Sequence, residues 1–135
     1  MAKLRHIALA VRDLEESAKF YENAFGMERV RESDVAVMMS DGVMSLALLY
    51  LPTNENTEPD ERGRQFIGLH HMGFLTDDMA TACAHVEAAG GTFHGHVKNV
   101  GVGEGNEAKY LDPNGIVLDV ANHLHREKSW CEPDS

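Results

Sequence analysis

Apolar and polar residues follow the same series of patterns twice along the chain. Residues 4–11 form an apolar stretch, then comes an amphipathic stretch, and three shorter apolar stretches follow. The same order begins again near residue 69. A period of two residues predicts strands, and a period near 3.6 residues predicts helices. The pattern therefore predicts two tandem βαβββ modules.

Each predicted helix begins after an aspartate and ends at glycine. The first begins after Asp13, a good N-cap, and ends at Gly26, which tolerates the left-handed conformation of a helix end. The second begins after Asp77 or Asp78 and ends at residues 90–91. Turn sequences separate the later strands, with Asp-Gly at 41–42 and Asp-Pro-Asn-Gly at 112–115. The strands predicted after the helices are 27–32, 35–40, 44–51, 92–99, 107–111 and 116–122.

The length of 135 residues fits a single domain. We divide it into module one (3–51), a polar linker (52–66), module two (67–122) and a C-terminal tail (123–135). The net charge of −10 argues against a nucleic-acid partner or an anionic membrane surface. No apolar stretch reaches the roughly 18 residues of a membrane span. Two cysteines make no disulfide framework, which fits a cytoplasmic protein.

The two modules also repeat individual residues. His71 follows His6 by 65 residues, and the same offset places Asp78 on Asp13 and residue 91 on residue 26. The stretches that carry the repeat are HIALAVRDLEESAKFYENAFGM, GLHHMGFLTDD and YLDPNGIVLDV. Together they resemble the vicinal-oxygen-chelate family over residues 3–122. That family includes glyoxalases, methylmalonyl-CoA epimerases, extradiol dioxygenases, and bleomycin- and fosfomycin-resistance proteins.

The resemblance implies a fold and a metal site. The fold is α+β, with both βαβββ modules forming one curved, cup-shaped mixed sheet of the glyoxalase/dioxygenase type. The metal ligands it implies are His6, His71 and Asp119. The residues support this independently, because small neighbours share the strand face of each histidine. Asp119 interrupts an apolar strand, so its carboxylate must pair with a cation, take up a proton or bind a metal.

Two histidines and one carboxylate suit non-haem Fe(II) with open positions for substrate. We therefore predict one divalent metal ion per chain, with Fe(II) favoured, although Mn, Ni, Co or Zn would suit the same ligands. Ala47 stands where many family members have a glutamate that serves as ligand and base. By resemblance to ring-cleaving members, Tyr110 is predicted to orient or protonate the substrate, although a place in the core or in the hairpin explains this tyrosine equally well.

Other histidines are weaker candidates. His94, His96 and His123 are predicted as further contacts to the metal site or the substrate, although a surface position explains each of them equally well. His70 is expected on the strand face opposite to His71.

Three functions remain open at this point. The first is a metal-dependent dioxygenase or related lyase acting on a small oxygenated, aromatic compound. The second is a metal-dependent lyase or isomerase of the glyoxalase or epimerase kind, which the alanine at position 47 disfavours. The third is a metal-free protein that binds small molecules, as bleomycin-resistance proteins do. In each case the expected partners are a small molecule and a second copy of the chain in a homodimer.

Overall fold

The computed structural model describes residues 1–50, 66–100 and 105–122. In these residues the predicted order of elements is confirmed. Module one contains β1 (Lys3–Ala10), α1 (Leu14–Phe25), β2 (Glu28–Glu32), β3 (Ala36–Ser40) and β4 (Ser45–Leu49). Module two contains β5 (Gly68–Thr76), α2 (Met79–Ala88), β6 (Thr92–Val100), β7 (Gly105–Leu111) and β8 (Val117–Asn122).

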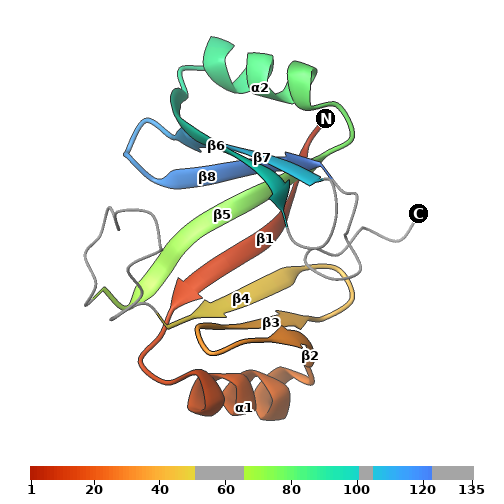
Figure 1. Cartoon of the computed structure of the whole chain (residues 1–135), viewed down its shortest axis with the longest axis vertical. Coiled ribbons are helices and arrows are strands. Elements are labelled where there is room, and N and C mark those ends of the chain that lie inside the picture. The colour runs from red at the N-terminus through yellow and green to blue at the C-terminus, as the bar shows by residue number, and fades with distance from the viewer. Residues whose placement is uncertain (51–65, 101–104, 123–135) are drawn as a thin grey trace.

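All eight strands belong to one sheet in the order β2-β3-β4-β1-β5-β8-β7-β6 (Figure 1). Within each module the first and last strands are parallel neighbours, β1 with β4 and β5 with β8. The modules meet where β1 pairs antiparallel with β5. The first strands of the two modules therefore lie side by side at the centre of the sheet.

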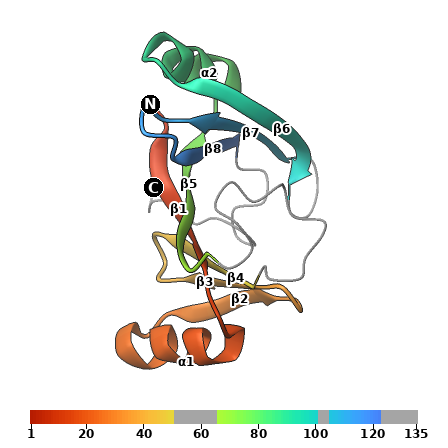
Figure 2. The ribbon, with the colours of Figure 1, turned by 90° about the vertical axis from the view of Figure 1, so that its left-hand side faces the viewer.

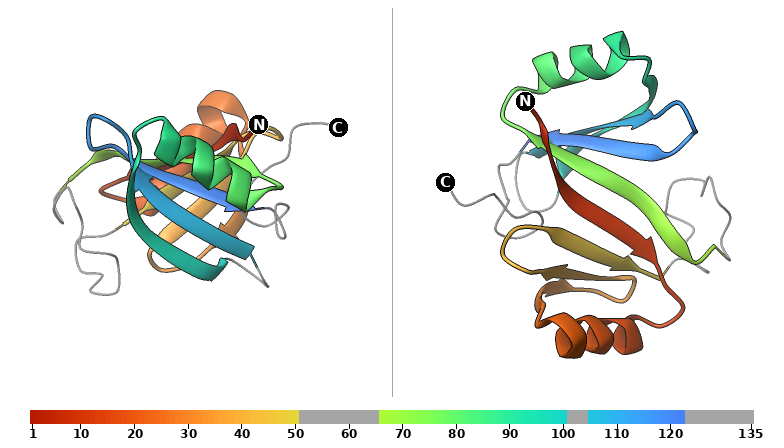
Figure 3. Two further views of the ribbon diagram at one scale, coloured as in Figure 1. Left: turned by 90° about the horizontal axis from the view of Figure 1, so that it is seen from above. Right: turned by 180° about the vertical axis from the view of Figure 1, so that it is seen from behind.

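The sheet is curved, and both helices lie on its outer side (Figure 2). Helix α1 packs on β3 and β4, around a core of Ala18, Val37, Met39 and Leu48. Helix α2 packs on β8, around a core of Ala82, Ala108, Tyr110 and Val120. We call the side of the sheet without helices the concave face. Views from above and behind show that each helix covers one end of the sheet, while β1 and β5 run between them (Figure 3).

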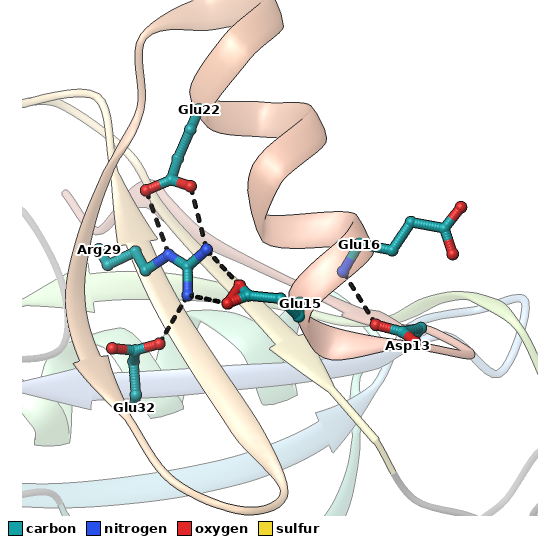
Figure 4. A network of polar contacts seen from close by, with 6 residues as sticks. All are labelled: Asp13, Glu15, Glu16, Glu22, Arg29 and Glu32. Atoms are coloured by element: carbon teal, nitrogen blue, oxygen red, sulfur yellow. Dashed lines mark hydrogen bonds and ion pairs between the residues drawn. The ribbon is translucent and has the colours of Figure 1, made fainter.

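The helix ends follow the sequence prediction closely. The Asp13 carboxylate accepts a hydrogen bond of 2.8 Å from the Glu16 amide, and Gly26 is left-handed with φ 68°. In module two the N-cap is Asp78, whose carboxylate accepts from the Thr81 amide at 3.0 Å. The side chain of Arg29 on β2 connects the sheet to α1 through Glu15 and Glu22, and it also pairs with Glu32 on its own strand (Figure 4).

The strand bounds agree with the prediction to within two residues. β7 begins at Gly105, where the prediction begins at residue 107. It pairs with β6 up to Val100, so both strands extend further than the sequence pattern indicates. The predicted linker, apart from Phe66, and the predicted tail lie outside the described residues. No helix in the described part of the chain is long and apolar enough to cross a membrane.

Candidate functional site

The three predicted ligands come together on the concave face. His6 on β1 and Asp119 on β8 both stand opposite Gly73 of β5 in the strand register, and His71 lies two residues before that glycine. The imidazole rings of His6 and His71 have centroids 5.4 Å apart. His71 Nε2 lies 3.1 Å from Asp119 Oδ2. Residues from both modules of one chain therefore form the cluster.

Two further charged residues join this cluster from β7. Lys109 stands directly opposite Asp119 in the β7–β8 register. Its Nζ donates to Asp119 Oδ1 at 3.0 Å and to Glu107 Oε1 at 3.3 Å. The side chains are mostly buried, at 13% exposure for Lys109, 12% for Glu107 and 2% for Asp119. The buried Asp119 carboxylate therefore forms an ion pair with the Lys109 ammonium.

Neither Glu107 nor Lys109 was predicted as a site residue from the sequence. The signal was the segment Glu107-Ala-Lys-Tyr110, in which charged and apolar residues alternate as they do on a half-buried strand. That alternation places Glu107 and Lys109 on one face. Which strand the face meets depends on the cross-strand register, and the spacing of residues within one strand does not contain that information.

Burial and mutual proximity set the protonation of the histidines. Burial, followed by the neighbouring His71, lowers the pKa of His6 to about 3. Burial, followed by the Lys109 ammonium, lowers the pKa of His71 to about 3. Both imidazoles are therefore neutral at pH 7.

The pKa values of Glu107 and Lys109 are shifted in the opposite direction, upward. Burial, together with a hydrogen bond and charge repulsion from Asp119, raises the pKa of Glu107 to about 7. Burial would lower the pKa of Lys109, but the neighbouring Asp119 and Glu107 outweigh it and raise that pKa. At neutral pH the site thus holds a charged Lys109–Asp119 pair beside a carboxyl group that exchanges its proton readily.

Both ring nitrogens of His71 lie close to other side chains. Nε2 lies 3.1 Å from Asp119 Oδ2, and Nδ1 forms a hydrogen bond of 2.8 Å with Nδ1 of His70. Either ring can be the donor in the Nδ1–Nδ1 hydrogen bond, depending on its tautomer. Protein groups therefore engage both ring nitrogens of His71.

His70 lies beside His71, contrary to the expectation that it points to the other face. Ala8 pairs with His71 and Leu9 pairs with Leu69, which leaves His70 as an extra residue in β5. This β-bulge turns the two rings toward each other, at an interplanar angle of 74°.

A divalent metal does not fit the donors as they are arranged. Asp119 Oδ1 accepts a hydrogen bond from Lys109, whose ammonium lies where a cation bound to this carboxylate would lie. Nδ1 of His6 pairs with Ser45 Oγ at 3.0 Å. In the described part of the chain, no three His, Cys, Asp or Glu side chains are placed to hold one ion. The metal site at His6, His71 and Asp119 therefore stays a prediction, and a metal would have to displace Lys109.

Tyr110 does not lie at this site, so its position does not support the predicted contact with the substrate. It is 2% exposed and packs among Ala82, Ala108 and Val120 beneath α2. Its ring meets Phe93 edge-on at 5.6 Å. Because strand residues alternate in direction, Tyr110 points to the face opposite that of its neighbour Lys109.

Three further histidines were predicted near the metal site or the substrate, namely His94, His96 and His123. His96 is exposed and stands opposite Ala108 in the register, on the helix side of the sheet. His94 lies at an irregularity in the β6–β7 pairing, and it is half-buried. The structure brings neither of them into the cluster, and His123 lies outside the described residues. Ala47 is buried on β4, and both carboxyl groups of the cluster, those of Glu107 and Asp119, come from module two.

The sequence matches one family model over nearly its whole length. The Glyoxalase/Bleomycin resistance protein/Dioxygenase superfamily model matches residues 3–120. A lactoylglutathione lyase of Schizosaccharomyces pombe is 27% identical, and the match covers 89% of this chain and 47% of that enzyme. This chain thus spans about half the length of the yeast enzyme. A lactoylglutathione lyase of Haemophilus influenzae is also 27% identical, over 87% of this chain and 90% of that enzyme.

Solved structures share the fold at low identity. A variant of the methylmalonyl-CoA epimerase of Streptomyces coelicolor, in complex with 2-nitronate-propionyl-CoA, has a TM-score of 0.66 and 22% identity. It covers 93% of this chain and 96% of its own. The Mn(II)-bound glyoxalase of Novosphingobium aromaticivorans has a TM-score of 0.68 and 15% identity, over 100% of this chain and 43% of its own. The chain belongs to the glyoxalase/bleomycin resistance protein/dioxygenase superfamily.

Proposed function

We propose that this protein is a lyase or isomerase that moves a proton at a carbon next to a carbonyl group, with Glu107 as the base. The observation that carries the proposal is the Glu107 carboxyl group on the concave face, held beside the Lys109–Asp119 pair. Glu107 supplies a carboxyl group that position 47 lacks, because the sequence has alanine there and not glutamate.

The names of the relatives indicate a substrate class. Lactoylglutathione and methylmalonyl-CoA are both thioesters, and each has one hydrogen and one further oxygen-bearing group on the carbon beside the thioester carbonyl. We extend this class to the present chain. The substrate is then a small acyl thioester, or a related α-oxygenated carbonyl compound, bound on the concave face.

The reaction balances without a redox partner. Glu107 takes the proton from the carbon beside the carbonyl, and the electron pair of the broken C–H bond forms the C=C bond of an enolate. The negative charge moves to the carbonyl oxygen. Protonation of that carbon from its opposite face, by solvent water, gives epimerisation, and Glu107 then loses its proton to solvent. Where the carbon carries a hydroxyl group, return of the proton by Glu107 to the former carbonyl carbon gives isomerisation, because the hydroxyl proton moves to the former carbonyl oxygen and a new C=O bond forms at the first carbon. A carboxyl group that titrates near pH 7 is suited to both proton transfers.

The dioxygenase hypothesis loses its substrate-contacting residue, because Tyr110 lies beneath α2. We therefore favour proton transfer over ring cleavage. Assembly as a homodimer remains a prediction, and the proposed proton transfer does not require the divalent metal that the sequence predicts.

Solvent-deuterium exchange tests the proposed function. The purified protein is incubated in D2O with lactoylglutathione and with methylmalonyl-CoA, and loss of the α-hydrogen signal is followed by NMR. We expect catalysed exchange with at least one of these compounds. Glu107→Gln should lower the exchange rate by about 10²- to 10⁴-fold, the usual contribution of a positioned base.

Glu28→Gln is the matched control, because Glu28 is exposed on β2 and distant in the sheet order. It should exchange at the wild-type rate. Exchange that persists in Glu107→Gln would exclude Glu107 as the base. Absence of exchange by the wild-type protein, with a compound shown to bind, would instead support a small-molecule binding protein.

A further inference from the structure

We infer that the Lys109 ammonium is the resident cation of this site and takes the place that a divalent metal would occupy on Asp119. The argument begins with charge. Asp119 is 2% exposed, and a carboxylate at that depth needs a positive partner. Lys109 supplies it at 3.0 Å and contacts Glu107 with the same ammonium group. The positive charge of the cluster therefore comes from the chain itself.

The position of Lys109 explains why metal and lysine exclude each other. Lys109 binds Asp119 Oδ1, and His71 Nε2 lies 3.1 Å from Asp119 Oδ2. A metal ion bound by Asp119 and His71 would need the lone pair of His71 Nε2, which the neutral ring offers when its hydrogen is on Nδ1. It would also place a second cation within contact distance of the ammonium, at a site with little water to screen the repulsion. Binding of a metal therefore requires Lys109 to leave.

The Lys109 ammonium can also stabilise negative charge on a substrate oxygen, as a metal ion would. An ammonium has three N–H groups, and two of those of Lys109 point to Asp119 and Glu107. The third is available to a carbonyl oxygen that approaches Glu107. If the proposed proton transfer holds, this N–H would stabilise the enolate oxygen at the same point where Glu107 removes the proton. This consequence rests on the proposed function, whereas the exclusion of metal does not.

Removal of the positive charge should reveal a latent metal site. The wild-type protein, Lys109→Met and Lys109→Arg are each dialysed against EDTA and then titrated with Mn²⁺, Ni²⁺ and Zn²⁺. Metal per chain is measured by elemental analysis, and the melting temperature is measured with each metal and with EDTA. Lys19→Met, which removes a charge from an exposed position on α1, is the matched control.

We expect the wild-type protein, Lys109→Arg and Lys19→Met to bind no stoichiometric metal, and metal should not change their melting temperatures. Lys109→Met should bind one ion per chain, at least about tenfold more tightly than the wild-type protein, and metal should raise its melting temperature. If Lys109→Met fails to fold in EDTA, refolding with metal should recover it.

Three results would overturn the inference. The first is about one tightly bound ion per wild-type chain. The second is a Lys109→Met variant that gains no metal affinity. The third is a gain of metal affinity in Lys109→Arg equal to that in Lys109→Met, because the retained charge should prevent it. None of these measurements needs a substrate, so they stand even if the deuterium-exchange assay fails.

Discussion

Tyr110 is placed by packing, and its hydroxyl group is directed away from the concave face. The ring fills the core beneath α2, and burial and a hydrogen bond with Cys83 raise the pKa of the phenol. We expect Tyr110→Phe to leave deuterium exchange unchanged and to lower the free energy of unfolding by about 1 kcal/mol, the usual value of one hydrogen bond. Tyr110→Ala should lower it by about 3–5 kcal/mol. Urea denaturation measures both, and a large loss of exchange in Tyr110→Phe would contradict this assignment.

The strand face of a residue was predictable where the pattern of its own strand was sufficient to assign it. The face of His6 follows from the alternation along β1, and that of Asp119 from its place among apolar residues of β8. Lys109 was not predicted, because its role depends on which residue of the neighbouring strand lies opposite. The alternation along β7 also separates Tyr110 from its charged neighbour Lys109, because adjacent strand residues point to opposite faces.

The two helices end at equivalent glycines that are required for different reasons. Gly26 and Gly91 are equivalent in the sequence repeat, but only Gly26 is left-handed, with φ 68°, and there is open space around it. A Cβ on Gly91 would overlap the Val86 side chain and lie 3.0 Å from the Val86 carbonyl oxygen. One glycine is therefore required by backbone conformation, and the other by close packing.

Asparagine substitutions distinguish these two causes. Gly26→Ala should lower the free energy of unfolding by about 1 kcal/mol, and Gly26→Asn should cost less, because asparagine tolerates the left-handed region. At Gly91 both alanine and asparagine should destabilise, since each adds the same Cβ. Urea denaturation of the four variants provides the measurement. A Gly91→Asn variant as stable as the wild-type protein would contradict the packing explanation.

The elements themselves were largely predictable, because helix caps and turns are local signals. Asp13 and Asp78 begin the two helices as expected. The β-bulge at His70 was not predictable, since it arises from the pairing of β5 with β1 and leaves no mark in the alternation of β5 alone.

The whole molecule combines two similar modules into one asymmetric site. Module one contributes His6 and Ser45, while module two contributes His71, Glu107, Lys109 and Asp119. The internal repeat predicts the two modules, and the family resemblance predicts their joint cup. The repeat cannot predict that the charged residues gather on the second module, because β7 and its module-one counterpart β3 have different sequences.

The uneven distribution of buried groups has a consequence for stability against pH. The ordinary pKa of histidine is 6.5, and in the folded protein both His6 and His71 titrate at about 3. Their contribution to stability is present above pH 6.5 and is lost as the pH falls toward 3. Glu107 has the opposite sign, because its pKa rises from 4.5 to about 7. Its contribution is present below pH 4.5 and is lost as the pH rises through 7.

Between pH 4.5 and 6.5 the unfolded chain therefore binds two more protons at the histidines and one fewer at Glu107. In total the unfolded chain binds one more proton than the folded protein. These three groups therefore make the free energy of unfolding increase by about 1.4 kcal/mol for each unit by which the pH rises. Glu107→Gln removes the opposing proton, so its slope should be about 1.4 kcal/mol per pH unit steeper than that of the wild-type protein. Urea denaturation at several pH values across this window measures the difference, in which the other titrating groups cancel. Glu28→Gln should keep the wild-type slope, and a Glu107→Gln slope that is equal or shallower would show that Glu107 is already ionised in the folded protein at pH 4.5.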